Sequence, residues 1–215
     1  MPSNVTHWRV NLPSNGRDDI ALYVVNHLQE NTLSTLREYL AQKKLAVLAR
    51  DARDPATIEP RTLQAQASAA GRSGVRRIRI RDFQILTDSE ADYAGYDLGP
   101  SSPELQLGVL GSCLTHVFLI HAAKHDVPLD SIEVDISAQI DPRAGKPGYE
   151  DVPVNPHDIQ YTVRLESPAD RATIDRLHEI VERACPILNL LQRPQTITGS
   201  IELVNSERQA PALAA

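Results

Sequence analysis

Residues 99–117 read GPSSPELQLGVLGSCLTHV, and this stretch decides the fold. Ser102 is a good N-cap, Pro103 suits the first position of a helix, and Glu104 in the first turn interacts favourably with the helix dipole. From Pro103 to about His125 the sequence is apolar on nearly every side. Because a helix of this kind has no face suited to water, we expect it to be enclosed by other elements.

The same stretch is about as long as a membrane span. It nevertheless carries five polar side chains, which are Gln106, Ser112, Thr115, His116 and His121. Polar residues at this density are rare in a membrane-spanning helix, so we interpret it as a buried helix of a soluble protein. The first residues of the chain lack the apolar segment of a targeting signal. The sequence therefore predicts a cytoplasmic protein that does not bind membranes.

Strands and shorter helices flank this helix. Before it, residues 61–89 alternate between apolar and polar side chains around the turn Gly71-Arg72-Ser73-Gly74, which predicts a β-hairpin or meander with one face in water. After it, the patterns predict strands at 131–140 and 158–166, a helix from about 168 that ends at Cys185, a further helical turn, and a last strand at 196–204. This order predicts an α+β fold, with helices laid on an antiparallel sheet.

The N-terminal part stands apart in this scheme. We expect residues 1–60 to form an appendage to a main domain of residues 61–205, with a flexible tail at 206–215. In the appendage, residues 20–28 suit either a strand or the start of a helix, and Asn31 or Thr32 can cap a second helix. Apolar residues follow at spacings of three and four: Leu33, Leu36, Tyr39, Leu40, Leu45 and Leu48. Such a stripe predicts packing on the main domain or on a partner subunit.

Composition argues against several classes of function. The chain has 215 residues, of which 41% are hydrophobic and 23% charged, as in globular proteins. Aromatic residues are 4% and the formal net charge is -6, so we expect no binding to nucleic acid. The basic run Arg76, Arg77, Arg79 and Arg81 alternates with isoleucine, which is typical of the wet face of a strand. Phosphate-binding and dinucleotide-binding motifs are absent from the sequence, and we expect no cofactor.

Two cysteines, Cys113 and Cys185, are the candidate functional residues. Free cysteine is among the most buried residue types, so each also has a purely structural explanation. On the functional side, Cys185 precedes Pro186, and a helix starting there would lower the pKa of a nearby thiol. The small residues Gly111 and Ser112 leave room beside Cys113. These features suit one thiolate that attacks and a second thiol that resolves.

A metal site is the weaker interpretation of the same region. His116 lies three residues after Cys113, on nearly the same helix face. A zinc site needs three or four convergent ligands, and Cys113, His116 and the distant Cys185 fall short of that. We therefore expect no metal, and we expect His116 to pack in the core or to tune Cys113 if charged.

Together with Ala184-Cys185-Pro186, which follows 72 residues after Cys113, residues 99–117 resemble the OsmC/Ohr family of thiol-dependent peroxidases. The resemblance covers about residues 61–204. It rests on the order of the elements, the start of the long helix, the small residues before Cys113 and the late Cys-Pro pair. It implies an OsmC-like fold in which long buried central helices lie between antiparallel sheets of an intertwined homodimer.

The resemblance also implies roles for four residues. Cys113 matches the peroxidatic cysteine, Cys185 the resolving cysteine, and Arg72 an arginine whose charge beside the sulfur favours thiolate. The alternative for Arg72 is an ordinary exposed turn residue. The peroxidase branches carry a glutamate ten residues before the cysteine, where this chain has Pro103, and Glu104 comes one position later. Glu104 is therefore either a bidentate partner of Arg72 or only a charge in the first helical turn.

The function implied by the resemblance is reduction of an organic hydroperoxide as an oxidative stress defence. Cys113 becomes a sulfenic acid, Cys185 condenses with it to a disulfide, and an external thiol restores the pair. The alternative from another class is a non-catalytic OsmC-like dimer that binds an apolar small molecule. In that case both cysteines are ordinary core residues.

Overall fold

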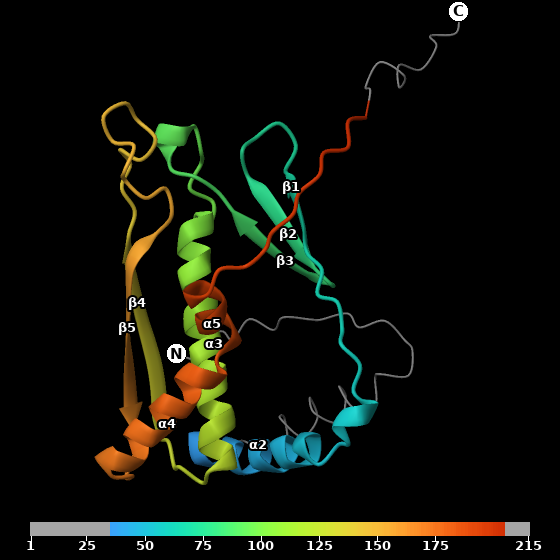
Figure 1. Cartoon of the computed structure of the whole chain (residues 1–215), viewed down its shortest axis with the longest axis vertical. Coiled ribbons are helices and arrows are strands. Elements are labelled where there is room, and N and C mark those ends of the chain that lie inside the picture. The colour runs from blue at the N-terminus through green and yellow to red at the C-terminus, as the bar shows by residue number, and fades with distance from the viewer. Residues whose placement is uncertain (1–34, 205–215) are drawn as a thin grey trace, which may run out of the picture.

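Helix α3 stands at the centre of the molecule, with strands on two sides of it (Figure 1). The computed structural model describes residues 35–204. The elements are α2 (Leu36–Asp51), η1 (Pro55–Thr57), β1 (Gln66–Ala69), β2 (Arg76–Ile80), β3 (Phe83–Thr87), η2 (Ala91–Tyr93), α3 (Ser102–Lys124), β4 (Ser131–Gln139), β5 (His157–Glu166), α4 (Arg171–Ala184) and α5 (Pro186–Gln192). Strands β1, β2 and β3 form one antiparallel sheet and β4 and β5 another, which confirms the predicted α+β class.

A capping box starts helix α3. The hydroxyl of Ser101 accepts a hydrogen bond from the Glu104 N–H at 3.4 Å, and the Glu104 carboxylate accepts one from the Ser101 N–H at 2.7 Å. The expectation that Ser102 is the cap was therefore wrong by one residue. Ser101 is preferred because it has a glutamate three positions later, so that two otherwise unpaired N–H groups are satisfied together.

The core lies between α3, the β4–β5 sheet and helix α4. On α3 the buried residues are Leu110, Leu114, Val117, Phe118, Ala122 and Ala123. Side chains that alternate along β4 and β5 pack against them, with Ile136 opposite Tyr161 in the antiparallel register. A Cβ on Gly111 would lie 3.4 Å from the Ile136 Cδ1 atom, so the glycine permits a close approach of helix and sheet.

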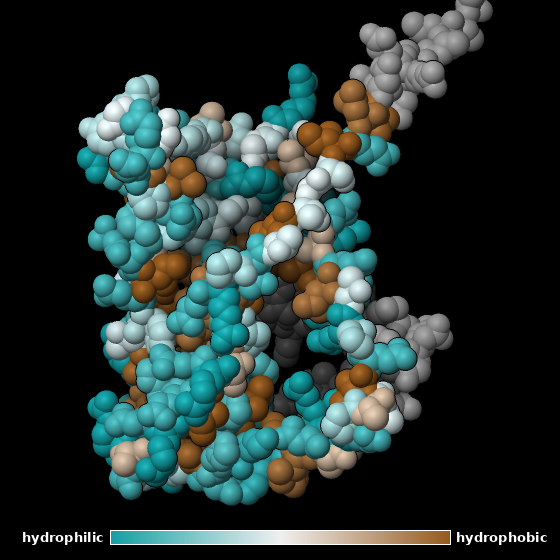
Figure 2. Space-filling view, viewed as in Figure 1, coloured by the Kyte–Doolittle hydropathy of each residue, from teal (hydrophilic) through white to brown (hydrophobic). Residues whose placement is uncertain are grey.

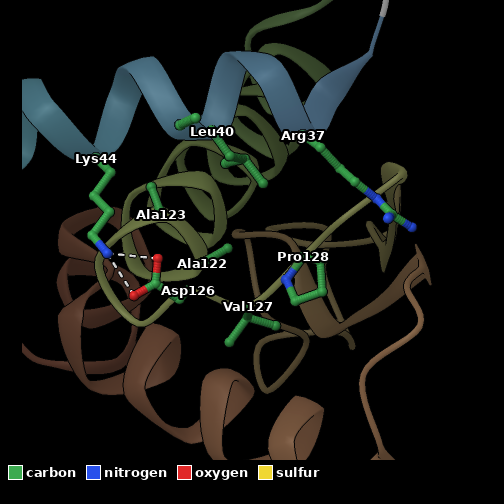
Figure 3. A pocket seen from close by; sticks show the side chains of 9 residues that line it. Arg37, Leu40, Lys44, Ala122, Ala123, Asp126, Val127 and Pro128 are labelled. Carbon is green, nitrogen blue, oxygen red and sulfur yellow. Dashed lines mark hydrogen bonds and ion pairs between the residues drawn. The ribbon is translucent and has the colours of Figure 1, made fainter.

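Helix α2 packs across the C-terminal half of α3. Thr35 caps it, and Leu40 is buried in the core cluster. Three ion pairs fix its position: Arg37 with Asp130 at 2.6 Å, Lys44 with Asp126 at 2.5 Å and Asp51 with Lys124 at 2.5 Å. Figure 3 shows the seam, a pocket of about 220 Å³ in which Leu40 faces Ala122 and Ala123. The element expected at 20–28 and the caps Asn31 and Thr32 lie outside the described residues.

The β1–β3 sheet lies on the opposite side of α3 from the β4–β5 sheet (Figure 1). Two apolar side chains of β3 are exposed in the single chain: Phe83 is 62% exposed and Leu86 is 45% exposed. Arg76 was expected on a wet strand face, but it is half-buried and holds the loop after β3. Its guanidinium donates to the Asp88 carbonyl at 2.7 Å and to the Thr87 and Ser89 hydroxyls.

The expected strand at 196–204 is absent. These residues run extended and unpaired, and Ile197, Ile201 and Leu203 are at least 90% exposed. A strand needs a neighbour for its N–H and C=O groups, and the described part of the chain places none beside this segment. The alternating pattern is typical of a strand, but within residues 35–204 of one chain the segment has no strand to pair with.

One described helix passes a test for membrane spans. By length and apolar composition alone α3 is suited to cross a membrane, and the core helix of a protein outside the membrane passes the same test. It contacts α2, β4, α4 and α5, and a third of its apolar stretch is buried within the single chain.

Candidate functional site

The fold brings the two cysteines together. The Sγ atoms of Cys113 and Cys185 lie 3.5 Å apart, although the residues are 72 positions apart in sequence. Both thiols are free, Cys113 being partly exposed and Cys185 completely buried. A disulfide has an S–S distance of about 2.05 Å, so the two sulfurs must approach by only about 1.5 Å to form one.

Helix α4 delivers Cys185 to this place. Leu177, Val181 and Cys185 follow one another at spacings of four, and all three are buried in the core cluster. Cys185 ends α4, where its N–H donates to the Val181 carbonyl at 2.8 Å, and it also begins α5. Pro186 then occupies the first position of α5, where its missing N–H costs nothing. The Cys-Pro pair is therefore a junction between two helices.

Burial raises the pKa of the Cys113 thiol. The backbone N–H of Ile187, in the first turn of α5, acts in the opposite direction and lowers this pKa, whereas the neighbouring Cys185 raises it further. The start of a helix after Pro186 was expected to favour thiolate on Cys185. That effect on Cys185 stays a prediction, while the first turn of α5 also favours the thiolate of Cys113 through the Ile187 N–H.

An apolar cavity opens beside Cys113. It has a volume of about 460 Å³ and is lined by Leu105, Gly108, Val109, Ser112, Cys113, His116 and Ile187. His116 is the one ring with a titratable nitrogen in this lining. Burial lowers its pKa, and the charges of Lys43 and Arg50 on α2 lower it further, so the ring is neutral at neutral pH. Cys113 therefore faces a largely apolar space.

The single chain does not bring Arg72 and Glu104 together. Arg72 is exposed in the turn after β1, where Gly71 has a φ of +60°. Within residues 35–204 no ion pair joins Arg72 to Glu104, whose carboxylate is held by Ser101 in the capping box. The hydrogen bonds from Ser101 lower the pKa of Glu104. Of the four residues predicted for the site, the structure therefore brings the two cysteines into contact.

A polar network behind Cys185 was missed from the sequence. The Tyr161 hydroxyl donates to the Glu182 carboxylate at 2.7 Å and lies 2.8 Å from His178 Nε2. Burial is the main cause that raises the pKa of Tyr161, with Glu182 second. The network ties β5 to α4 one turn before Cys185. The sequence did indicate that His178 and Glu182 lie close together, since they are four residues apart on one helix face.

Asn189 was also missed. Its side-chain amide donates to the carbonyl of Cys185 at 2.8 Å and to the carbonyls of Glu182 and Arg183. The available signal was an asparagine in the otherwise apolar run Ile187 to Leu191, directly after the Cys-Pro pair. Among the described residues, no group of three His, Cys, Asp or Glu side chains is placed to hold a metal ion.

Fold and site together define an α+β protein with two free thiols in contact between a central helix and a helix junction. Residues 95–200 match the family described as OsmC-like protein, and this range contains both cysteines. The part of the chain that carries the site thus matches the OsmC-like family, and the resemblance seen in the sequence is confirmed.

Solved structures agree with this fold. The OsmC-like protein of Mycoplasma pneumoniae is 16% identical with a TM-score of 0.54, and the match covers 62% of this chain and 89% of that one. An OsmC-like protein of unknown function from Vibrio cholerae is 13% identical, with a TM-score of 0.47 over 61% and 94% of the two chains. The organic hydroperoxide resistance protein OhrB of Bacillus subtilis is 19% identical, with a TM-score of 0.41 over 61% and 91%. Of these three, the first exceeds 0.5 and shows a shared fold. No curated protein matches the sequence.

Proposed function

We propose that this protein reduces organic hydroperoxides with Cys113 and Cys185 and thereby takes part in peroxide defence. The observation that carries the proposal is the 3.5 Å distance between the two sulfurs, because a second thiol in contact can trap an oxidised first one. The OsmC-like family, which the sequence resemblance associates with thiol peroxidases, supports it. We further propose the cytoplasm as its place of action, since free thiols are maintained there.

The reaction proceeds in three balanced steps. The Cys113 sulfur attacks the distal peroxide oxygen, the O–O bond breaks, and the thiol proton ends on the departing alcohol, which leaves Cys113 as a sulfenic acid. The Cys185 thiol then displaces water from that sulfur and forms the disulfide. Two equivalents of an external thiol, or one dithiol, reduce the disulfide by exchange and are themselves oxidised.

Roles for the two cysteines follow from their exposure. Cys113 borders the apolar cavity and is reached by a substrate, whereas Cys185 is fully buried behind it. The apolar lining favours peroxides with a hydrophobic group over hydrogen peroxide. No residue of the described chain supplies a cation to the Cys113 sulfur.

We propose that a second copy of the chain supplies the cation that is missing beside the Cys113 sulfur. The cavity beside Cys113 is open, Val109 on the same face of α3 is 40% exposed, and the β1–β3 sheet lacks a cover over Phe83 and Leu86. Apolar surfaces of this extent mark an interface. We propose a homodimer in which the proposed role of Arg72 beside the sulfur is fulfilled across the interface.

Thiol counting tests the function. The reduced protein, freed of reductant, is treated with one equivalent of cumene hydroperoxide, and remaining thiols are counted with a chromogenic reagent. We expect both thiols of each chain to disappear, and peptide mapping to show a bond between Cys113 and Cys185. The competing proposal is a binding protein for an apolar small molecule, favoured by the apolar lining and by the raised pKa of Cys113. An unchanged thiol count would support that protein instead.

A further inference from the structure

Asn189 lies where helices α4 and α5 meet. The last carbonyl groups of a helix have no partner within it and must find one elsewhere. Here the Nδ2 group of Asn189 donates to the carbonyls of Glu182 at 3.0 Å, Arg183 at 3.3 Å and Cys185 at 2.8 Å. One side chain on α5 therefore bonds two carbonyls of the last turn of α4, and it also bonds the Cys185 carbonyl, which accepts the Asn189 backbone N–H at 3.1 Å as well.

The junction depends on such a contact. Cys185 leaves the helical conformation, with φ of -71° and ψ of 113°, and Pro186 has no N–H with which to continue the hydrogen bonds of α4. The thiol of Cys185 makes no capping bond to α5. Because Asn189 is one turn beyond Cys185, its amide fixes the direction of α5 relative to α4 and holds Cys185 between them.

The position of this junction decides how the sulfurs meet. Cys185 Sγ must move toward Cys113 Sγ by about 1.5 Å for the disulfide to form. Reactions between groups held in a near-attack geometry lose about 100-fold in rate for a misplacement of about 1 Å.

We propose that Asn189 is a positioning residue that holds Cys185 in place for disulfide formation with Cys113. This inference rests on the proposed function for its biological meaning, since it assigns the residue to the resolving step. It does not concern the attack of Cys113 on the peroxide, which takes place before Cys185 reacts.

Rapid-mixing kinetics separate the two steps. Asn189→Ala removes the amide, and Asn189→Asp keeps the shape but replaces the donor by a charge that repels the three carbonyls. With cumene hydroperoxide we expect the first oxidation of Cys113 to stay within about twofold of wild type. Disulfide formation should slow by about 10- to 100-fold in both variants, and dimedone should trap more Cys113 sulfenic acid.

Asn155→Ala is the matched control. It makes the same change at an exposed asparagine in the loop before β5, whose amide donates to the Pro156 carbonyl. Both of its rates should equal those of wild type. Asn189→Gln keeps the donor on a longer stem and should fall between wild type and Asn189→Ala, which separates loss of the hydrogen bonds from loss of packing.

A measurement without peroxide separates this inference from the proposed function. Equilibration of each protein with glutathione buffers gives the effective concentration of one thiol toward the other, whatever the oxidant. We expect a decrease of about tenfold in Asn189→Ala and none in Asn155→Ala. An unchanged value in a folded Asn189→Ala variant would overturn the positioning role. Normal glutathione behaviour of the wild type without any reaction with peroxide would instead overturn the peroxidase function and leave the role of Asn189 standing.

Discussion

At the scale of single residues, the two sulfurs are in contact but are not equivalent. Cys113 is partly exposed beside the apolar cavity, while Cys185 is 0% exposed at the junction of α4 and α5. A peroxide that enters the cavity meets Cys113 first. We therefore base the proposed chemical roles on access to the cavity and not on which thiol precedes a proline.

Serine variants test this assignment. Cys113→Ser should abolish peroxide consumption, because the attacking sulfur is gone. Cys185→Ser should react once and stop at a Cys113 sulfenic acid, which mass spectrometry detects as a dimedone adduct. The reverse pattern, with the adduct lost in Cys185→Ser, would show that the roles are inverted. If both variants lose only some stability from a buried hydroxyl, the cysteines are core residues.

His121 makes stability depend on pH. Its Nδ1 atom is buried without a hydrogen-bond partner among the described residues, and burial, with the charges of His125 and Lys124, lowers its pKa, partly offset by Asp51. The unfolded chain therefore binds a proton more readily than the folded one. The stabilisation is complete above the unfolded pKa of about 6.5 and is lost as the pH falls through the lower folded value.

Urea unfolding at pH 7, 6 and 5 measures this effect. The free energy of unfolding should fall steadily toward pH 5 in the wild type and less steeply in His121→Gln, whose side chain does not titrate. His157→Gln removes a histidine at the start of β5, away from α3, and serves as the control. A slope in His121→Gln as steep as in wild type would assign the pH dependence to other groups, such as His116, whose pKa is also lowered.

At the scale of elements, helix α2 has one residue that anchors it. Leu40 is 5% exposed, whereas Leu45 on the same helix is 71% exposed. Leu40→Ala should lower the free energy of unfolding by about 2–4 kcal/mol through lost burial and the cavity that remains. Leu45→Ala should change it by less than about 0.5 kcal/mol. Equal effects in urea unfolding would mean that Leu40 does not anchor α2 on α3.

Sequence patterns predicted the helices and strands better than the contacts between them. Helix α3 was located within a residue or two because its apolar run and first turn are local signals. The contact between Cys113 and Cys185 could not be predicted from local patterns, since none of them indicates that α5 packs on α3. It came instead from the resemblance. The hydrogen bonds of the half-buried Arg76 were not predicted, because they go to the loop after β3, which has no regular sequence pattern.

At the scale of the whole molecule, one copy leaves much apolar surface uncovered. Figure 2 shows apolar side chains along the segment that leads to the C-terminus, where Ile197 is 90% exposed and Ile201 is 95% exposed. The β1–β3 sheet and one face of α3 add to this surface. The organisation into an appendage at 1–60, a domain at 61–205 and a tail stays a prediction, although α2 makes three ion pairs with the rest.

Sedimentation tests the proposed homodimer. The wild type should sediment as a dimer at micromolar concentration, because a second copy covers these surfaces. Ile201→Glu places a charge on the extended segment and should shift the equilibrium toward monomer by at least tenfold in dissociation constant. Leu45→Glu makes the same kind of change on α2 and should leave it unaltered. A wild-type monomer at all concentrations would contradict the dimer and the role of Arg72 across it.

The separation of 72 positions between the two cysteines has a consequence for the lifetime of the protein. A bond between them closes a loop that contains β4, β5 and α4, and a loop of that length removes about 4 kcal/mol of chain entropy from the unfolded state. A molecule carrying the proposed disulfide would therefore be harder to unfold, and harder for proteases to degrade, than one with two free thiols. If the proposed peroxide reduction takes place in the cell, the disulfide form would therefore persist longer than the dithiol form while reductant is scarce.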